Sequence, residues 1–364
     1  MSATVTWARC LFNQTGPAST LAWTVKTRHG MTKSMEEKWW HRAGTPKRPR
    51  YIGTDGRLLT AKSTIARIEA LRIPPAWRDV HISPDPKRKI QAWGLDQKNR
   101  KQYIYSSEHV ETRDRRKWRR VLRVARALPR LREVTNQHLR RKQLDRAKVH
   151  ATVVRLICRA YMRAGSERYA TTNGTFGITT LKKSHVEIRG TSLVFKYRGK
   201  RSKEQRQFIA ATPLVHIIAE LMKLPGERLF QYLTPAGERR PVTAESVNRY
   251  LHEILDERYT SKDLRTFGGT LRAATILSDL GPPKNPTEAK RNLVLAAKLV
   301  SLDLGNTPAI CRKAYIHPRV FEEYELAGRT MTNIRKSRRK LEAQEPVHYY
   351  PEEAALMRFL QRYG

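Results

Sequence analysis

The sequence predicts an α+β protein, with a small mixed α/β domain followed by a larger, mainly helical domain. Its 364 residues are enough for two domains at about 150 residues each. Short alternating runs between turn residues occupy the first part of the chain, which is typical of short strands. Apolar residues at helical spacing dominate from residue 113 onward and are interrupted by one β-hairpin pattern.

The first 45 residues differ in composition from the rest of the chain. No Asp or Glu occurs before residue 36, and Arg9 interrupts the apolar run that a secretory signal needs. We therefore expect residues 1–45 to be a basic, flexible leader. The composition also permits a transit peptide, and either Met31 or Met35 as the true first residue.

Residues 46–112 have the pattern of a small N-terminal domain. Residues 51–56 have the pattern of a strand that enters a turn, and 61–73 show helical spacing that ends at two prolines. The runs 90–93 and 102–105 are typical of two strands joined by a polar turn.

Residues 113–364 form the second, mainly helical domain in this prediction. A long basic run over 131–164 carries apolar residues at helical spacing. Alternation on both sides of Gly190 predicts a β-hairpin within 177–199, followed by a basic tip at 198–202, so that the helical domain carries a hairpin or three-stranded insert. From Pro213 onward the pattern is helical again.

The charge of the chain indicates a polyanionic partner. Lys and Arg number 72 against 33 Asp and Glu, which gives a net charge of +39. Such an excess favours nucleic acid over an anionic membrane. No run approaches the 18 apolar residues of a membrane-spanning helix. The 3 cysteines have no CxxC spacing, so we expect neither a disulfide framework nor a metal site. We expect the protein to occupy a reducing compartment.

Local sequence carries only weak evidence for chemistry. Residues 260–263 have the form of a capping box, which places Lys262 and Arg265 near the start of a helix. Free backbone N–H groups and two cations there would bind a phosphate, although a solvated basic helix end has the same pattern. Composition and spacing alone therefore indicate a nucleic-acid-binding protein and no particular reaction.

Four segments, taken in order, resemble type IB DNA topoisomerases of the poxviral and bacterial kind. They are residues 94–105, 163–169, 262–266 and 305–315. The first looks like the family's G-x-D-x-x-G-R-x-Q-Y-x-Y segment, with Asn99 where glycine is usual. The second and third (KDLRT) look like the motifs with the two catalytic arginines, and the fourth resembles the nucleophile motif. Gly199-Lys200 is a short fifth match, and the resemblance covers about residues 50–330.

The resemblance implies a role for five residues. Tyr315 would be the nucleophile, and Arg163 and Arg265 would bind the scissile phosphate. Lys200 would be the general acid. Asn306 stands where viral members carry histidine, nine residues before the tyrosine. An amide still donates a hydrogen bond to a non-bridging oxygen, but it carries no charge.

The resemblance also implies a DNA-binding surface. The residues expected to contact DNA are Arg100, Lys101, Gln102, Tyr103, Tyr105, Arg168, Tyr169 and Lys262. In the N-terminal domain, the arginine and the lysine would contact phosphates while the glutamine and the two tyrosines face the DNA. An ordinary edge strand with a basic turn is the alternative for that segment. The N-terminal domain would close over the duplex opposite a tyrosine-recombinase-like catalytic domain, forming a C-shaped clamp.

The implied activity is relaxation of positive and negative supercoils by transient cleavage of one DNA strand. The strand would be joined to Tyr315 through a 3′-phosphotyrosyl bond, rotate and be resealed, with no ATP, cofactor or obligatory metal. We expect a monomer that acts on duplex DNA in the cytoplasm, associated with the nucleoid, without an obligatory protein partner or a membrane.

Two alternatives stay open. Tyrosine recombinases share the Arg–Lys–Arg–Tyr chemistry, but they usually have histidine in place of Lys262 and histidine or tryptophan in place of Asn306. Both departures favour a topoisomerase. A non-catalytic basic architectural or RNA-binding protein is the other alternative, and it would form no covalent DNA adduct.

Overall fold

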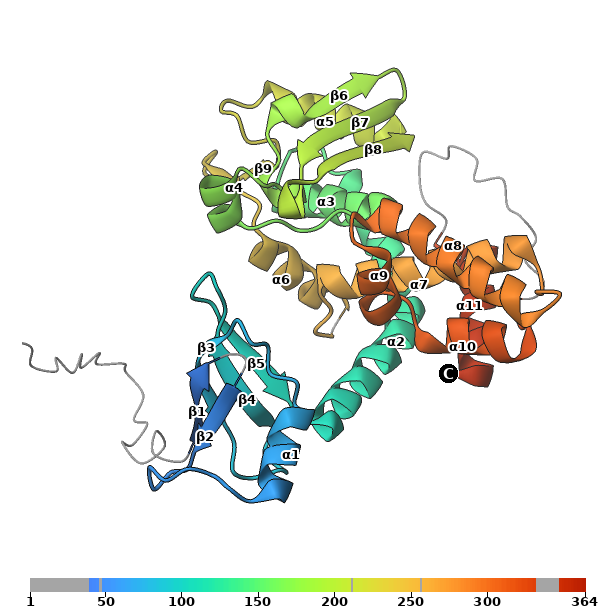
Figure 1. Cartoon of the computed structure of the whole chain (residues 1–364). Helices are drawn as coiled ribbons and strands as arrows, with labels where there is room; N and C mark the ends of the chain where they lie inside the picture. The colour runs from blue at the N-terminus through green and yellow to red at the C-terminus, as the bar shows by residue number, and fades with distance from the viewer. Residues whose placement is uncertain (1–38, 46–47, 211, 256, 332–346) are drawn as a thin grey trace, which may run out of the picture. The chain divides into compact units, whose positions relative to one another are not determined.

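The computed structural model describes residues 39–45, 48–210, 212–255, 257–331 and 347–364 (Figure 1). The chain divides into two compact units, one up to Val110 and one from Glu111. Helices and small antiparallel sheets occur among these described residues, which confirms the predicted α+β class.

The first unit is a five-stranded antiparallel sheet with one helix. The strand order is β2-β1-β3-β4-β5. Its elements are β1 (Trp40–Thr45), β2 (Arg48–Ile52), α1 (Lys62–Ala70), β3 (Arg78–Ile82), β4 (Ile90–Leu95) and β5 (Lys101–Tyr105). Ile68 on α1 is 1% exposed and packs in a small core with buried residues of β2, β3 and β4. The predicted helix and the last two predicted strands are therefore confirmed.

Strand β1 corrects the expected extent of the leader. Residues 40–45 lie within the stretch 1–45 that the composition assigned to a flexible leader, yet they form a strand between β2 and β3. Trp40 pairs with Ile82 and packs against the core of the first unit. The strand has no apolar alternation. Pairing with a strand on each side and the half-buried Trp40 ring stabilise it. Residues 1–38 lie outside the described part of the chain.

The second unit is mainly helical. Its helices are α2 (Ser107–Leu139, which crosses the boundary), α3 (Arg146–Ala160), α4 (Glu167–Asn173), α5 (Thr212–Lys223), α6 (Ala244–Leu255), α7 (Ser261–Leu280), α8 (Pro286–Leu304), α9 (Pro308–Ala314), α10 (Pro318–Ala327) and α11 (Pro351–Tyr363). Val149, Val153 and Leu156 on α3 are fully buried, which confirms the predicted apolar stripe. The single long helical pattern is broken before α3, where the Asp145 carboxylate accepts a hydrogen bond from the Lys148 N–H at 2.9 Å.

Two small sheets complete the second unit. The predicted hairpin is present as β6 (Val186–Arg189) and β7 (Ser192–Arg198), and β8 (Glu204–Ala210) pairs with β7 to make three antiparallel strands. The predicted basic tip connects β7 to β8. A second sheet of β9 (Gln231–Leu233) and β10 (Arg239–Pro241) escaped the sequence analysis because each strand has only 3 residues.

The described helices differ from membrane-spanning helices in length or composition. No single one is long and apolar enough to cross a membrane, whereas α8 and α9 together pass on length and composition but are bent by 93°.

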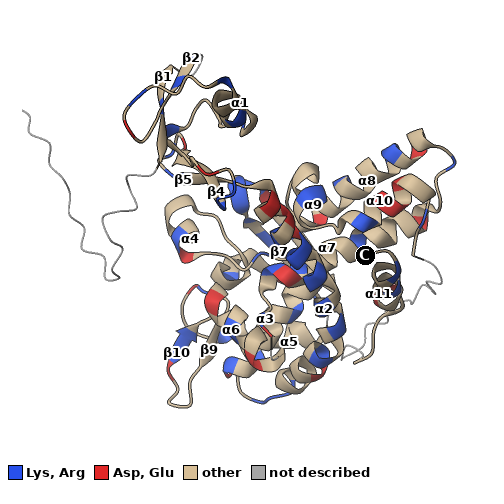
Figure 2. Cartoon of the chain, turned by 90° about the horizontal axis from the view of Figure 1, so that it is seen from below, with Lys and Arg blue, Asp and Glu red and all other residues tan. Residues whose placement is uncertain are grey.

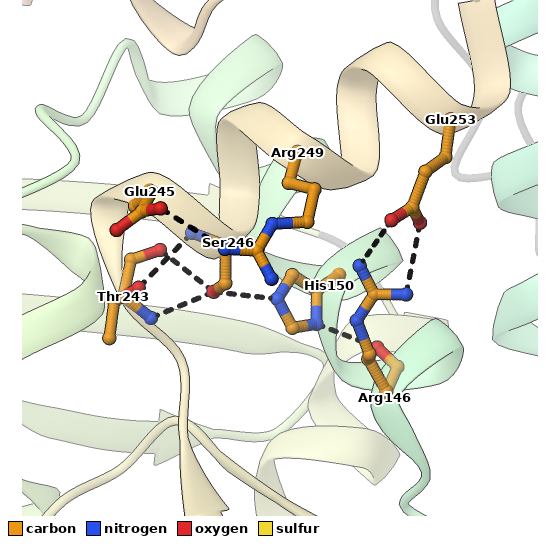
Figure 3. Close-up of polar contacts among 7 residues, drawn as sticks. All are labelled: Arg146, His150, Thr243, Glu245, Ser246, Arg249 and Glu253. Atoms are coloured by element: carbon orange, nitrogen blue, oxygen red, sulfur yellow. Dashed lines mark hydrogen bonds and ion pairs between the residues drawn. The ribbon is translucent and has the colours of Figure 1, made fainter.

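A polar cluster around the buried His150 joins α3 to α6 (Figure 3). His150 is fully buried, its Nδ1 lies 2.7 Å from the Arg146 carbonyl oxygen, and its Nε2 lies 2.8 Å from Ser246 Oγ. Because a carbonyl only accepts, Nδ1 carries the proton, and Nε2 shares the Ser246 hydroxyl hydrogen with the Thr243 carbonyl at 2.9 Å. Arg146 forms a two-point ion pair with Glu253 at 2.8 and 2.9 Å. Burial lowers the pKa of His150 to about 4, so the ring is neutral at physiological pH.

The shifted pKa of His150 makes the fold sensitive to acid. The unfolded chain takes up this proton near the ordinary value of 6.5 and the folded chain only near 4. The contribution of neutral His150 to the free energy of unfolding is therefore complete above about pH 6.5, and up to about 3 kcal/mol is lost as pH falls to 4.

Urea unfolding at pH 7 and at pH 4.5 measures this loss. The free energy of unfolding should fall less between the two pH values for His150→Gln than for the wild type. His216→Gln, at an exposed position of α5, is the control. An equal loss in wild type and His150→Gln would contradict this origin.

Candidate active site

The turn between α8 and α9 is the place where the two predicted catalytic arginines meet. Arg265 Nη2 donates to the Leu304 carbonyl at 3.1 Å, and Arg163 Nη2 donates to the Gly305 carbonyl at 2.9 Å. Leu304 is the last residue of α8, and Gly305 caps the helix with a left-handed φ of 61°. The chain therefore turns sharply there and offers both carbonyls to the guanidiniums.

Arg265 is buried near the start of α7. The capping box predicted for this helix start is confirmed, since the Asp263 carboxylate accepts from the Thr260 N–H at 2.9 Å. The Arg265 side chain is only 3% exposed. Burial lowers its pKa to about 10, and the neighbouring Tyr315 phenol opposes that shift. The guanidinium stays cationic at neutral pH.

Arg163 lies in an irregular segment after α3. The helix ends at Tyr161, which has a left-handed φ of 51°. The Arg163 carbonyl then accepts from the Ile178 N–H at 2.8 Å, which pairs the segment with a distant part of the chain. A Cβ on Gly177 would lie 2.6 Å from the Gly165 backbone nitrogen, so this close approach of two main chains requires glycine.

Tyr315 ends α9 beside Arg265. Its backbone N–H donates to the Cys311 carbonyl at 2.9 Å, and its side chain is half-buried. The Arg265 guanidinium carbon lies 5.5 Å from the centroid of the Tyr315 ring. The structure thus brings the predicted nucleophile together with one of the predicted phosphate-binding arginines.

Asn306 connects the turn to the other arginine. Its Oδ1 accepts a hydrogen bond from Arg163 Nη2 at 2.5 Å. Its Nδ2 is buried and has no hydrogen-bond partner among the described residues. A buried donor without a partner costs about 1–3 kcal/mol, so this amide is suited to pairing with an acceptor on a ligand.

Lys200 forms no hydrogen bond with the other four predicted catalytic residues. It lies exposed at the tip between β7 and β8, where Arg201 and Ser202 have left-handed φ values of 63° and 55°. Lys200 makes no hydrogen bond or ion pair with the residues that the structure describes. The tip end of the same hairpin adjoins the catalytic turn: Gln205 follows the tip on β8, and a Cβ on Gly305 would lie 2.2 Å from Gln205 Oε1. Its role as general acid stays a prediction.

Two residues near the site escaped the sequence analysis. Tyr197 is buried on β7 and its hydroxyl donates to Gln207 Oε1 at 3.3 Å; burial raises its pKa, and the charges of the two arginines oppose this. Lys117 on α2 donates to the Lys313 carbonyl at 3.2 Å, two residues before the tyrosine, and burial lowers its pKa to about 8. Alternation showed that Tyr197 faces inward, but no sequence signal separated Lys117 from the other basic residues of its helix.

Part of the predicted DNA-binding surface of the first unit lies on one face of β5. The rings of Tyr103 and Tyr105 stack at 6.1 Å, and Tyr103 is 43% exposed. The Lys101 ammonium lies 3.5 Å from the centroid of the Trp93 ring on the neighbouring strand. These side chains form an exposed basic and aromatic surface.

The turn before β5 is organised by Asp96. Arg100 pairs with this carboxylate at 2.6 Å, and their hydrogen bond holds the pKa of Asp96 at about 2. Gln102 lies on the opposite face of the strand from Tyr103, and its amide donates to Asp96 at 3.0 Å. Asn99 adopts a left-handed φ of 54°, which explains why glycine is usual there and why asparagine is tolerated.

The predicted DNA contacts of the second unit are exposed. Arg168 and Tyr169 lie on α4, where the tyrosine is 54% exposed, and Lys262 lies on the first turn of α7. Figure 2 shows Lys and Arg on many elements of this unit, including α2, α8 and α9. These positions are open to a polyanion.

A cleft in the second unit is lined by residues other than the predicted catalytic ones, and the described residues form no metal-binding cluster. A cleft of about 540 Å³ lined by residues of β8, α7 and α8 does not include Arg163, Arg265 or Tyr315. Within the described ranges, no group of three or more His, Cys, Asp or Glu side chains could hold a metal ion. The site therefore consists of guanidinium, amide and phenol groups.

Comparison with known families gives two matches that follow one another along the chain. Residues 49–96 match the family described as "Bacterial DNA topoisomerase IB, N-terminal domain". Residues 100–344 match "Eukaryotic DNA topoisomerase I, catalytic core". The second match alone spans more than half of the chain.

Individual relatives carry the same name. DNA topoisomerase 1B of Acanthamoeba polyphaga mimivirus is 32% identical over 268 residues, which cover 72% of this chain and 80% of that protein. DNA topoisomerase 1B of Vaccinia virus (strain Copenhagen) is 28% identical over 242 residues, covering 63% and 70%. A solved structure of the XerH site-specific recombinase bound to palindromic difH substrate aligns with 55% of this chain and 50% of its own. The identity is 15% and the TM-score is 0.36, too low to bear on the fold. The family matches and the mimivirus relative agree: the chain belongs to the type IB DNA topoisomerase family.

Proposed function

We propose that this type IB topoisomerase, an isomerase, cleaves and reseals one strand of duplex DNA through Tyr315. The observation that carries the proposal is the meeting of three groups at the α8–α9 turn. Arg163 and Arg265 bind the adjacent carbonyls of Gly305 and Leu304, and the Tyr315 ring lies 5.5 Å from the second guanidinium. A phosphodiester that binds both guanidiniums is thereby placed near the phenol.

The proposed reaction is a transesterification. The Tyr315 oxygen attacks the phosphorus and loses its proton to solvent, the bond from phosphorus to the 5′-oxygen breaks, and a 3′-phosphotyrosyl bond forms. Covalent catalysis of this kind conserves the free energy of the phosphodiester, so resealing by the 5′-hydroxyl needs no ATP. Between the two steps the cut strand rotates and supercoils of either sign relax.

The two arginines and the asparagine would stabilise the transition state. Negative charge builds up on the phosphorane oxygens, and planar guanidiniums bind such oxygens with two parallel hydrogen bonds. Loss of one preorganised donor of this type costs about 10²–10³ in rate. The unpaired Nδ2 of Asn306 is a further neutral donor for a non-bridging oxygen.

Lys200 would protonate the 5′-oxygen as it leaves. The β7–β8 hairpin that carries it adjoins the catalytic turn near its tip, through Gln205 and Gly305. We propose that bound DNA draws the exposed tip toward the scissile bond. Lysine suits this step, because arginine holds its proton too tightly to donate it.

DNA is the partner of the enzyme. We propose that the two units close around the duplex as a C-shaped clamp and that the enzyme acts as a monomer, in the cytoplasm at the nucleoid. The basic and aromatic face of Lys101, Tyr103 and Tyr105 supports DNA binding by the first unit. Exposed basic residues such as Arg168 and Lys262 support it for the second.

Plasmid relaxation tests the reaction and its nucleophile together. Tyr315→Phe keeps the ring beside Arg265 but removes the attacking oxygen. In EDTA and without ATP, the wild type and Tyr363→Phe, a control on α11, should relax negatively supercoiled plasmid, and Tyr315→Phe should not, although it still shifts DNA in a gel. Relaxation by Tyr315→Phe would show that another residue is the nucleophile. Failure of the wild type would contradict the proposed reaction itself.

A sulfur leaving group tests the role of Lys200. A 5′-bridging phosphorothiolate leaves as a thiolate and needs no proton. We expect Lys200→Ala to slow cleavage of the ordinary substrate by about 10²–10⁴ and to cleave the phosphorothiolate nearly as fast as the wild type does. Lys203→Ala on the same hairpin is the control. Equal defects of Lys200→Ala on both substrates would exclude Lys200 as the acid.

A further inference from the structure

Thr270 lies where α7 meets the segment that carries the nucleophile. It is fully buried, five residues after Arg265 on the same helix. Its Oγ1 lies 3.2 Å from the Tyr315 carbonyl oxygen and 3.1 Å from the backbone nitrogen of His317. One hydroxyl therefore contacts the main chain on both sides of residue 316.

The hydrogen-bonding pattern separates Thr270 from the other threonines of α7. The hydroxyls of Thr266 and Thr275 each donate to the carbonyl four residues earlier, both at 2.9 Å. Thr270 makes the same bond to Thr266, also at 2.9 Å. Its single hydrogen is therefore shared between that carbonyl and the Tyr315 carbonyl, while its oxygen accepts from His317.

Gly269 brings the Tyr315 main chain close enough for these bonds. A Cβ at position 269 would lie 2.9 Å from the Tyr315 carbonyl oxygen and 3.3 Å from the Tyr315 Cβ. Any larger residue would push the segment away from α7. The glycine and the threonine together set how near the nucleophile's backbone lies to the helix.

The same segment is bound from α2 as well. Lys117 donates to the Lys313 carbonyl at 3.2 Å, and the Trp118 ring lies 5.2 Å from the His317 ring. These contacts lie two residues to either side of Tyr315. Thr270 contacts the main-chain carbonyl of Tyr315 itself.

We propose that Thr270 is a positioning residue for the nucleophile. Its hydroxyl fixes the main chain of Tyr315 on the helix that also carries Arg265, and so sets the distance from the phenol to the bound phosphate. This inference depends on the proposed role of Tyr315 in DNA cleavage. Thr270 is fully buried, so it acts through Tyr315 and touches no DNA.

The test is single-turnover cleavage of a 5′-labelled duplex oligonucleotide at a site mapped first with the wild type. Thr270→Val keeps the shape and removes the hydroxyl. A misplaced nucleophile reacts about 10- to 100-fold more slowly, so we expect that loss in rate with unchanged DNA affinity. Thr270→Ser keeps the hydroxyl and should recover most of the rate.

The leaving group distinguishes positioning of the nucleophile from other roles. The defect of Thr270→Val should be equally large with a 5′-phosphorothiolate, since the attack by the phenol is what is slowed. Thr275→Val removes only a hydrogen bond within α7 and should cleave as the wild type does. Gly269→Ala retains the hydroxyl but displaces the Tyr315 main chain, so it should also slow cleavage. This variant tests the inference if Thr270→Val does not fold.

Four outcomes would overturn the inference. They are wild-type rates in Thr270→Val or in a folded Gly269→Ala, a serine variant as slow as the valine variant, rescue by the sulfur leaving group, and an equal defect in Thr275→Val. Absence of a covalent adduct with the wild type would instead contradict the proposed function, so the two failures are distinguishable.

Discussion

The active site depends on the C-terminal end of α8. The last carbonyls of a helix have no partners within it and carry partial negative charge. In this chain, two of them are bonded to the guanidiniums of Arg163 and Arg265, at 2.9 and 3.1 Å. Two neighbouring positive charges repel each other, and here the helix end offsets that repulsion before any DNA arrives. In the proposed reaction, this arrangement holds the paired arginines in place for a phosphate.

This arrangement explains why distant segments must converge. Arg163 follows α3, Arg265 lies on α7, and the carbonyls belong to the turn that leads into α9 and Tyr315. Helix α7 supplies the charge and also carries Gly269 and Thr270, which contact the main chain of the tyrosine. In the proposed mechanism, α7 therefore sets the spacing between Tyr315 and Arg265.

Local signals in the sequence predicted the local structure well. The capping box at Thr260, the apolar stripe of α3 and the β6–β7 hairpin are all present, because each depends on residues near one another in the chain. Strand β1 and the break before α3 were missed. Sheet pairing stabilises the strand, and a cap without glycine or proline marks the break. Neither leaves a periodic pattern.

The residues of the site were suggested by motif resemblance, but their contacts were not. Nothing in the motifs indicated that Asn306 accepts a hydrogen bond from Arg163, or that Lys200 is exposed at the hairpin tip. Strand alternation alone separates Gln102 from Tyr103, yet the motif groups them as one DNA-facing set. Contacts between residues far apart in the chain decide which side chains meet and which are exposed. A single sequence does not contain this information.

The most direct test of this account is to identify the residue and the DNA end that are joined in the covalent adduct. Trypsin would release residues 314–319 as a peptide whose only tyrosine is Tyr315. After nuclease digestion of trapped wild-type adduct, mass spectrometry should find a nucleotide on that peptide, linked through its 3′-phosphate. A nucleotide on another peptide, or one linked through its 5′-phosphate, would contradict the account.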